Sequence, residues 1–248
     1  MNIFDKLPND VFLRATKLNA RLIAAELHDL GINVDCAPVL DVPIKGAHDI
    51  IGDRALSHDP ARVAAIGRAV CDGLLEGGIL PVIKHIPGHG RAFADSHLEL
   101  PQVDANQDEL IKSDFLPFRE LADQPLAMTA HVVYTALDAK HPATTSPRVI
   151  FEFLRGEIGF DGLLMSDDLS MKALSGNMEE RTKASLAAGC DIVLHCNGEM
   201  REMQAVTQSA RPLDAEGIRR WSKAASLLHP PLPFDFSAAK TELASLLA

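Results

Sequence analysis

The apolar residues along this 248-residue chain follow two spacings that alternate from one end to the other. Short apolar runs bounded by polar or turn residues predict buried parallel strands at 32–40, 80–85, 127–134, 162–165 and 191–195. Longer segments with apolar residues three or four positions apart predict helices at 8–30, 60–76, 107–122, 147–158 and 178–188, with further helices toward Ala248. Strands that alternate with helices in this way indicate βα units around one parallel sheet.

Proline and glycine mark several of these boundaries. Pro60 opens one helix and Gly77 follows its end, which is the usual asymmetry of helix termini. Pro117 should kink or divide the helix at 107–122, because proline lacks the amide hydrogen that a helix interior needs.

The predicted elements favour an α/β protein with a (β/α)8 TIM-barrel fold, which residues 1–248 would form as a single domain. No G-x-G-x-x-G follows the first strand and no Walker glycine-lysine motif occurs, so a doubly wound nucleotide-binding fold loses its best support. A closed barrel needs eight strands, whereas five are predicted here. The segment 199–248 has room for one more weak strand and nothing before Pro8 can hold another, so we expect a barrel that is incomplete at its N-terminus.

The predicted strand at 162–165 is followed closely by two neighbouring carboxylates, Asp167 and Asp168. In parallel α/β folds, catalytic residues gather at the carboxyl ends of strands, and a charged pair beside a buried strand is costly unless it serves a purpose. The alternative is that one of the two simply caps the following helix. The pattern alone leaves both interpretations open.

Polar residues end the other predicted strands as well, so all of them should line one rim of the sheet: Asp41, Lys84, His85, His131, Asp167 and Asn197. Each has a simpler explanation when taken alone. A histidine at a strand end is more often hydrogen-bonded in the core than catalytic, and Asp41 could merely accept loop N–H groups. Their common register favours a functional site.

The loop from Lys84 to His97 carries three histidines and an aspartate within 14 residues. Imidazole and carboxylate are common zinc ligands, but the spacing matches no standard zinc pattern, so we expect no metal. Asp95 and His97 can instead form a carboxylate–imidazole pair that shuttles protons near neutral pH.

The composition of the chain limits the kind of partner and the cell compartment that we expect for it. The formal net charge of -10 argues against a nucleic-acid partner, since such proteins usually display a basic face. No signal peptide opens the chain and no apolar run reaches about 18 residues, so we expect neither export nor a membrane span but a cytoplasmic protein. The four cysteines lack C-x-x-C pairing and should be buried small hydrophobes.

Several motifs in order resemble the family 3 glycoside hydrolases, and within them the NagZ-type bacterial β-N-acetylglucosaminidases. The similarity runs from about Leu7 to Asn197. The motifs are Ala37 to Asp41, Ile51 to Arg54, Lys84 to Gly90 with Asp95 to His97, Ala130 to Tyr134, and Ser166 to Met171.

This resemblance implies a retaining, two-step hydrolysis that releases terminal β-linked N-acetylglucosamine from muropeptides during peptidoglycan recycling in the cytoplasm, without a cofactor. Matched by position, Asp167 is the nucleophile and His97 is the acid/base, assisted by Asp95. Arg54, Lys84 and His85 match the residues that hold the sugar. From their places on the rim we add His131 and Asn197 as substrate-binding candidates.

The residue types agree with that chemistry. A retaining glycosidase needs one carboxylate to attack the anomeric carbon and a second group to protonate the leaving oxygen. A histidine, with an ordinary pKa of about 6.5, can be that second group without a strongly shifted environment. Gly88 and Gly90 would give the loop the freedom to close over substrate.

Three other interpretations remain open at this stage. A phosphorylase would transfer the glycosyl group to phosphate instead of water, a sugar-binding remnant would not turn over at all, and a metal-dependent hydrolase would carry stoichiometric zinc.

The resemblance also implies two further βα units before Pro8, the second ending in an Asp-Gln-Glu-Gly-Gly-Arg-like motif whose aspartate binds the sugar. No such motif occurs in this chain. We therefore expect an incomplete form with weak or absent activity, which roughly 80 upstream residues, about two to three βα units, should restore. Exposed strand edges should favour self-association.

Overall fold

The structure is a computed structural model that describes residues 8–46, 51–92, 96 and 99–247. Its helices are α1 (Asn9–Asp29), the 3-10 helix η2 (Gly52–Arg54), α2 (Pro60–Glu76), α3 (Gln107–Lys112), α4 (Phe115–Glu120), the 3-10 helix η3 (Ala143–Thr145), the π-helix η4 (Val149–Glu157), α5 (Met178–Ala188), α6 (Met200–Ser209), α7 (Ala215–Ala225) and α8 (Phe236–Leu246). Its strands are β1 (Val34–Asp35), β2 (Leu80–Ile86), β3 (Gln102–Val103), β4 (Leu126–Thr129), β5 (Val133–Tyr134), β6 (Leu163–Asp168) and β7 (Ile192–Leu194).

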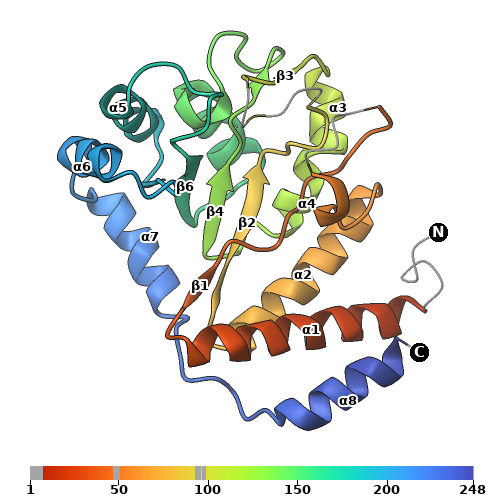
Figure 1. Cartoon of the computed structure of the whole chain (residues 1–248). Coiled ribbons are helices and arrows are strands. Elements are labelled where there is room, and N and C mark those ends of the chain that lie inside the picture. The colour runs from red at the N-terminus through yellow and green to blue at the C-terminus, as the bar shows by residue number, and fades with distance from the viewer. Residues whose placement is uncertain (1–7, 47–50, 93–95, 97–98, 248) are drawn as a thin grey trace.

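Five parallel strands form one sheet in the order β1-β2-β4-β6-β7, with the helices arranged around it (Figure 1). Each strand pairs with the next strand of its βα series, as parallel strands joined by crossover helices do. The sheet curls as part of a barrel does, but the described residues do not close it. The parallel α/β architecture is therefore confirmed, and the described strands form a half-barrel.

The two faces of the sheet pack against different layers. Ile83, Ala127 and Leu164 point outward into the main core, where they meet apolar side chains of α2, α4 and η4. Neighbouring positions point to the inner face, where Val82, Met128 and Met165 form a second cluster with Leu80, Leu126, Leu163 and Ala224 of α7. The alternation follows from the two-residue period of a strand, and it places Lys84 and Asp167 on the inner face beyond that cluster.

Several predicted boundaries agree with the structure. Helix α2 begins at Pro60 behind an Asp59 cap that accepts the N–H of Ala61, and α5 spans the predicted 178–188. The predicted helix at 107–122 is divided into α3 and α4. Its break lies at Ser113 and Asp114, and Pro117 falls in the first turn of α4, where a missing N–H costs little.

Other boundaries were wrong for identifiable reasons. The predicted strand at 32–40 contains the two-residue β1 and a separate bridge between Val39 and Lys84, because Pro38 cannot donate to the ladder. The run at 127–134 contains two strands, since β5 leaves the main sheet and pairs with β3. Among the described residues beyond 199, no further strand occurs.

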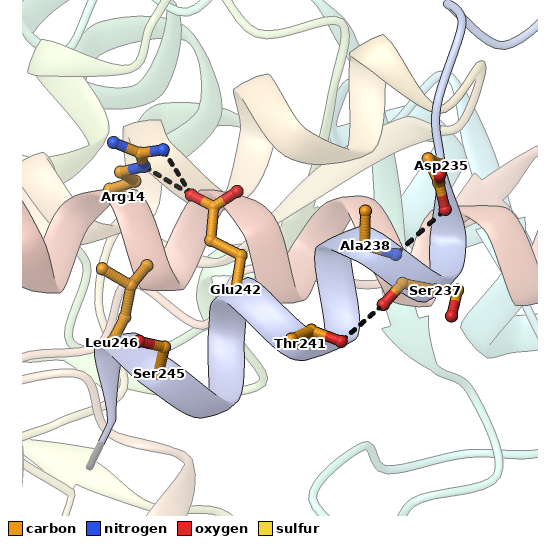
Figure 2. A pocket seen from close by; sticks show the side chains of 8 residues that line it. All are labelled: Arg14, Asp235, Ser237, Ala238, Thr241, Glu242, Ser245 and Leu246. Carbon is orange, nitrogen blue, oxygen red and sulfur yellow. Dashed lines mark hydrogen bonds and ion pairs between the residues drawn. The ribbon is translucent and has the colours of Figure 1, made fainter.

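Helix α8 lies alongside α1, away from the curled sheet (Figure 1). Arg14 of α1 is paired with Glu242 of α8, and these two helices line a shallow pocket of about 580 Å³ (Figure 2). None of the predicted site residues lines this pocket. Within the described part of the chain, no helix is both long and apolar enough to cross a membrane.

Candidate active site at the carboxyl ends of the strands

The two neighbouring carboxylates at the end of β6 have different surroundings. Asp168 accepts the N–H groups of Ser170 and Cys196, each at 3.0 Å, and the hydroxyl of Ser170 as well. Within the described residues, Asp167 accepts one hydrogen bond, from the N–H of Asp168 at 2.8 Å. Asp168 therefore organises the turn, and Asp167 keeps carboxylate capacity for another partner. Neither caps the following helix, because the cap of α5 is Asn177.

The turn that follows these carboxylates is fixed from α5. Arg181 donates to the carbonyl groups of Leu169 and Met171 at 2.7 and 3.0 Å, and to that of Gly176 at 2.9 Å. Leu169 and Met171 are themselves buried. The segment around Asp167 is thus held by side-chain packing and by a cation that satisfies its backbone carbonyl groups.

Lys84 and Asp167 both act electrostatically on two cysteines at opposite edges of the sheet. Partial desolvation raises the pKa of the Cys36 and Cys196 thiols, the negative charge of Asp167 adds to that effect, and the positive charge of Lys84 opposes it. Lys84 of β2, Asp167 of β6, and the cysteines that follow β1 and β7 therefore lie near one another at one end of the sheet. The expectation of buried cysteines was right for Cys71 and Cys190 but wrong for Cys36 and Cys196, which are exposed.

Asp41 is a buried carboxylate with three hydrogen bonds. Its Oδ1 accepts the backbone N–H groups of His85 and His89 at 3.2 and 2.6 Å, and its Oδ2 lies 2.7 Å from Nδ1 of His85. Burial alone would raise the pKa of Asp41, but His85 and then His89 hold it below its ordinary value. A charged acceptor at Nδ1 keeps a proton there, so Nε2 of His85 is the nitrogen left for a ligand.

His89 continues this network into the loop. Its ring is buried, Nε2 lies 3.1 Å from the hydroxyl of Ser96, and the ring meets that of His85 edge-on with centroids 5.9 Å apart. Burial lowers the pKa of His89 below its ordinary value, with Asp41 acting in the opposite direction. A neutral imidazole can share one proton with a hydroxyl, so this contact needs no buried charge, while Nδ1 of His89 has no hydrogen-bond partner among the described residues.

His131 is fully buried with both ring nitrogens engaged. Nδ1 lies 2.7 Å from the hydroxyl of Thr144, and Nε2 lies 3.1 Å from the backbone carbonyl of Asp168. Burial lowers the pKa of His131, against the effect of Asp167. The ring therefore supports the backbone beside the two carboxylates and has no nitrogen left for a sugar.

Two other predicted site residues, Asn197 and Arg54, lie outside the strands of the sheet. Asn197 donates to Glu202 at 2.6 Å and accepts the N–H of Glu199, so it shapes the start of α6 from an exposed position. Arg54 ends η2 and is exposed to solvent. Asp95 and His97 lie outside the described residues. Among the described residues, no three metal-ligating side chains come together.

A second buried carboxylate, Asp114, lies beneath the first part of the loop. It pairs with Nε of Arg91 at 2.6 Å, and the neighbouring Tyr134 hydroxyl donates to the carbonyl of Gly88 at 2.8 Å. Gly88 has a φ of 130° and lies against Asp114, so a side chain there would be strained and crowded. Gly90 lies against the carbonyl of Val42, so both glycines serve close packing in this structure.

Two residues of this site, Ser96 and Asp114, were not assigned roles from the sequence. Asp41 was recognised as a rim residue that could accept backbone N–H groups, as it does from His85 and His89, but its contact with the His85 ring was not expected. Asp114 stands in the segment 107–122, which was predicted as a helix kinked or divided at Pro117, and the sequence pattern held no signal for its burial. Ser96 could have been noticed only because it separates Asp95 from His97.

The buried position of Asp114 should make the stability of the protein depend on pH. Burial raises its pKa to about 6, against the hydrogen bond from Arg91. The folded state therefore binds this proton more tightly than the unfolded state, and the resulting stability is full below about pH 4 and lost as pH rises through about 6. Between about pH 4 and 7, wild type should lose about 2 kcal/mol of unfolding free energy relative to Asp114→Asn, which lacks the titration.

Urea unfolding at several pH values measures this difference. The exposed Asp104 supplies the matched control, because Asp104→Asn should follow wild type across the range. Parallel pH curves for wild type and Asp114→Asn would contradict the assigned burial.

Comparison with known proteins concerns the chain as a whole. The sequence pattern of the Glycosyl hydrolase family 3 N terminal domain matches residues 9–219. A β-hexosaminidase of Tolumonas auensis is 42% identical over 202 residues, covering 79% of this chain and 59% of that protein. A β-hexosaminidase of Bordetella avium is 41% identical over 199 residues, covering 79% and 56%. The chain thus spans somewhat more than half the length of these curated relatives.

Solved structures show the same fold. NagZ from Neisseria gonorrhoeae, in complex with N-trifluoroacetyl-D-glucosamine, matches with a TM-score of 0.82 and 34% identity over 96% of this chain and 71% of that one. A family 3 β-N-acetylglucosaminidase from Paenibacillus matches with a TM-score of 0.80 and 29% identity over 93% and 48%. The family pattern covers most of the chain, and the two β-hexosaminidases are 41–42% identical to it. The chain therefore belongs to the glycosyl hydrolase family 3 N-terminal domain family.

Proposed function

We propose that the chain carries the catalytic site of a retaining β-N-acetylglucosaminidase in which Asp167 is the nucleophile. The observation that supports this most directly is the contrast at the end of β6, where Asp168 is committed to the turn and Asp167 is not. In the first step Asp167 attacks the anomeric carbon while an acid protonates the leaving oxygen, and in the second step water releases the sugar. The proposed setting is a (β/α)8 barrel to which the described half-barrel contributes five strands.

The proposed acid/base is His97, with Asp95 orienting its ring. Support comes from the motif that the two residues form with the Lys84-to-Gly90 segment and from the buried network below that segment. The same histidine would then return as the base that activates water, since one group serves both steps of a retaining mechanism.

The sugar would be held mainly by Lys84, His85 and Arg54. Lys84 lies on the same face of the sheet as Asp167, and His85 offers Nε2 because Asp41 occupies Nδ1. For His131 we propose a supporting role instead of sugar contact, because both its nitrogens are engaged. To contact substrate, Asn197 would have to break its hydrogen bonds to Glu202 and Glu199.

The proposed substrates are muropeptides with a terminal β-linked N-acetylglucosamine, cleaved in the cytoplasm during peptidoglycan recycling. The names of the relatives, β-hexosaminidase and β-N-acetylglucosaminidase, support the sugar, and the resemblance to NagZ-type proteins supports the aglycone and pathway. No cofactor is needed, because both steps use only a carboxylate, an imidazole and water.

Replacement of Asp167 tests the nucleophile. Asp167→Ala should abolish hydrolysis of a chromogenic N-acetyl-β-glucosaminide in phosphate-free buffer, because it removes the nucleophile and with it the low-barrier route. The unfolding free energy should stay nearly unchanged, because the side chain of Asp167 makes few hydrogen bonds. Asp168→Ala should instead destabilise the fold by about 1–3 kcal/mol, because it leaves Ser170 and Cys196 amides unpaired.

A mechanism-based fluoro-sugar with mass spectrometry identifies the labelled carboxylate even where turnover is slow. The label should be on Asp167, and a label on Asp168 would refute the assignment. If sugar 1-phosphate is found among the products in phosphate buffer, the reaction is phosphorolysis, and the assignment of the nucleophile is unaffected.

The role of His97 is tested by varying the leaving group. General acid catalysis typically contributes about 10²–10⁴-fold, and it matters most when the leaving oxygen is strongly basic. His97→Ala should therefore reduce kcat most for alkyl or sugar aglycones and least for activated aryl glycosides. A reduction of equal size across all leaving groups would count against this role.

We further propose that copies of this chain associate through the open half-barrel. Within the described residues, β1 and β7 each have one strand neighbour, and Ile192 and Leu194 on β7 are only partly buried. Unpaired strand edges beside apolar side chains favour pairing with another chain. A second copy of this chain carries the same complementary edges, so it is the partner that fits.

Sedimentation velocity over a range of concentrations measures this association. Ile192→Lys should shift the chain toward monomer, because a charge on the inner face opposes its burial. Phe151→Lys, at a 60% exposed residue of η4 on the outer layer, is the control and should change nothing. A wild type that is monomeric at all concentrations would refute the proposal.

A further inference from the structure

Thr144, in the 3-10 helix η3, is completely buried, and its hydroxyl has three polar neighbours. It lies 2.7 Å from Nδ1 of His131, 2.8 Å from the hydroxyl of Thr129 and 3.1 Å from the backbone carbonyl of Ala130. Thr129 and His131 are completely buried as well. Three buried side chains thus form one hydrogen-bonded series that starts at the last residue of β4.

The proton positions in this series follow from its far end. Nε2 of His131 lies 3.1 Å from the carbonyl of Asp168, which can only accept, so Nε2 carries a proton. Burial lowers the pKa of His131 and favours the neutral ring, in which Nδ1 is then an acceptor. The Thr144 hydroxyl therefore donates to Nδ1, and the Thr129 hydroxyl is free to donate to Thr144.

Asp168 connects this series to the carboxylate of Asp167. Its carbonyl receives two N–H groups, from the His131 ring and from the amide of Met171, each at 3.1 Å. Its own amide donates to Oδ1 of Asp167 at 2.8 Å, which is the one hydrogen bond that this carboxylate accepts within the described residues. A rotation of the Asp168 backbone would therefore turn the Asp167 carboxylate with it.

On the side of β4, the His131 ring is the contact that holds this backbone. The ladder between β4 and β6 has its last pair at Met128 and Met165, three residues before Asp168. Beyond that pair, the imidazole of His131 bridges the two segments in place of a backbone hydrogen bond. Its orientation depends on Thr144, because a buried ring that lost its partner at Nδ1 would gain freedom to turn.

We propose that Thr144 is a positioning residue for the nucleophile. By orienting the ring of His131 it fixes the carbonyl of Asp168, and the amide of Asp168 in turn directs the carboxylate of Asp167. The proposal rests on the proposed function, in which Asp167 attacks the anomeric carbon. Attack requires the carboxylate oxygen to face that carbon, and a misplacement of about 1 Å can cost about 10²-fold in rate.

Three variants test this. Thr144→Val removes the hydroxyl and keeps the shape, and Thr144→Ser keeps a hydroxyl. Thr182→Val is the matched control, because Thr182 is also completely buried and its hydroxyl donates within α5, to the carbonyl of Met178 at 2.7 Å. Hydrogen exchange at the Asp168 amide reports its bond to Asp167 without turnover. Thr144→Val should speed this exchange by about tenfold, and the other two variants should leave it near the wild-type rate.

Nitrogen NMR of the His131 ring tests the proton positions. Wild type should show a proton on Nε2 and a hydrogen-bonded Nδ1 without one. Thr144→Val should shift mainly the Nδ1 resonance, because that nitrogen alone loses its donor. A wild-type ring without a proton on Nε2 would overturn the proposal, since it could not bind the carbonyl of Asp168.

The rate at which a mechanism-based fluoro-sugar labels Asp167 measures the attack itself. Such a reagent has an activated leaving group, so its rate depends little on the general acid. Thr144→Val should slow labelling by about 10- to 100-fold at saturating reagent, with the half-saturating concentration nearly unchanged, and Thr144→Ser should restore most of the rate. A purely structural role would reduce the fraction of protein that is labelled and leave the rate of the folded molecules unchanged.

Unchanged exchange at Asp168 in Thr144→Val would overturn the link between Thr144 and the carboxylate. Faster exchange together with a wild-type labelling rate would overturn the positioning role. A wild type that neither hydrolyses substrate nor takes up the label would count against the proposed function, and the exchange experiment would still decide whether Thr144 holds the carboxylate of Asp167 in place.

Discussion

The site depends on one buried carboxylate, that of Asp41, which must remain charged inside the protein. It does so because His85 and His89 supply it with three hydrogen bonds, two of them from the backbone. A buried charge without such partners would cost several kcal/mol, so the arrangement of the two histidines and the ionisation of Asp41 stabilise each other. The tautomer of His85 and the place of the His89 ring both follow from this interaction.

A second constraint is that the neighbouring carboxylates Asp167 and Asp168 have different hydrogen-bond partners. A carboxylate at the end of a parallel strand has loop amides nearby, and Asp168 takes up those of Ser170 and Cys196. Because those amides are satisfied, Asp167 can face the inner side of the half-barrel with little competition from the backbone.

The parallel α/β class and most element positions could be predicted from periodicity, since a buried strand and an amphipathic helix have different apolar spacings. The local length of strands could not, because Pro38 interrupts one ladder and β5 turns away to pair with β3. The sequence motif assigned the nucleophile's place to Asp167. It could not show that Asp168 is committed to the turn, nor that His131 is saturated, because those facts depend on which loop amides and hydroxyls arrive from distant segments.

The central claim is that Asp167 attacks the anomeric carbon, so that a sugar–enzyme bond first forms and then breaks. Two displacements at one carbon retain its configuration. Proton NMR during hydrolysis of an aryl N-acetyl-β-glucosaminide, recorded before mutarotation, measures the anomer released first. The account predicts the β-anomer of N-acetylglucosamine, and initial appearance of the α-anomer would contradict it.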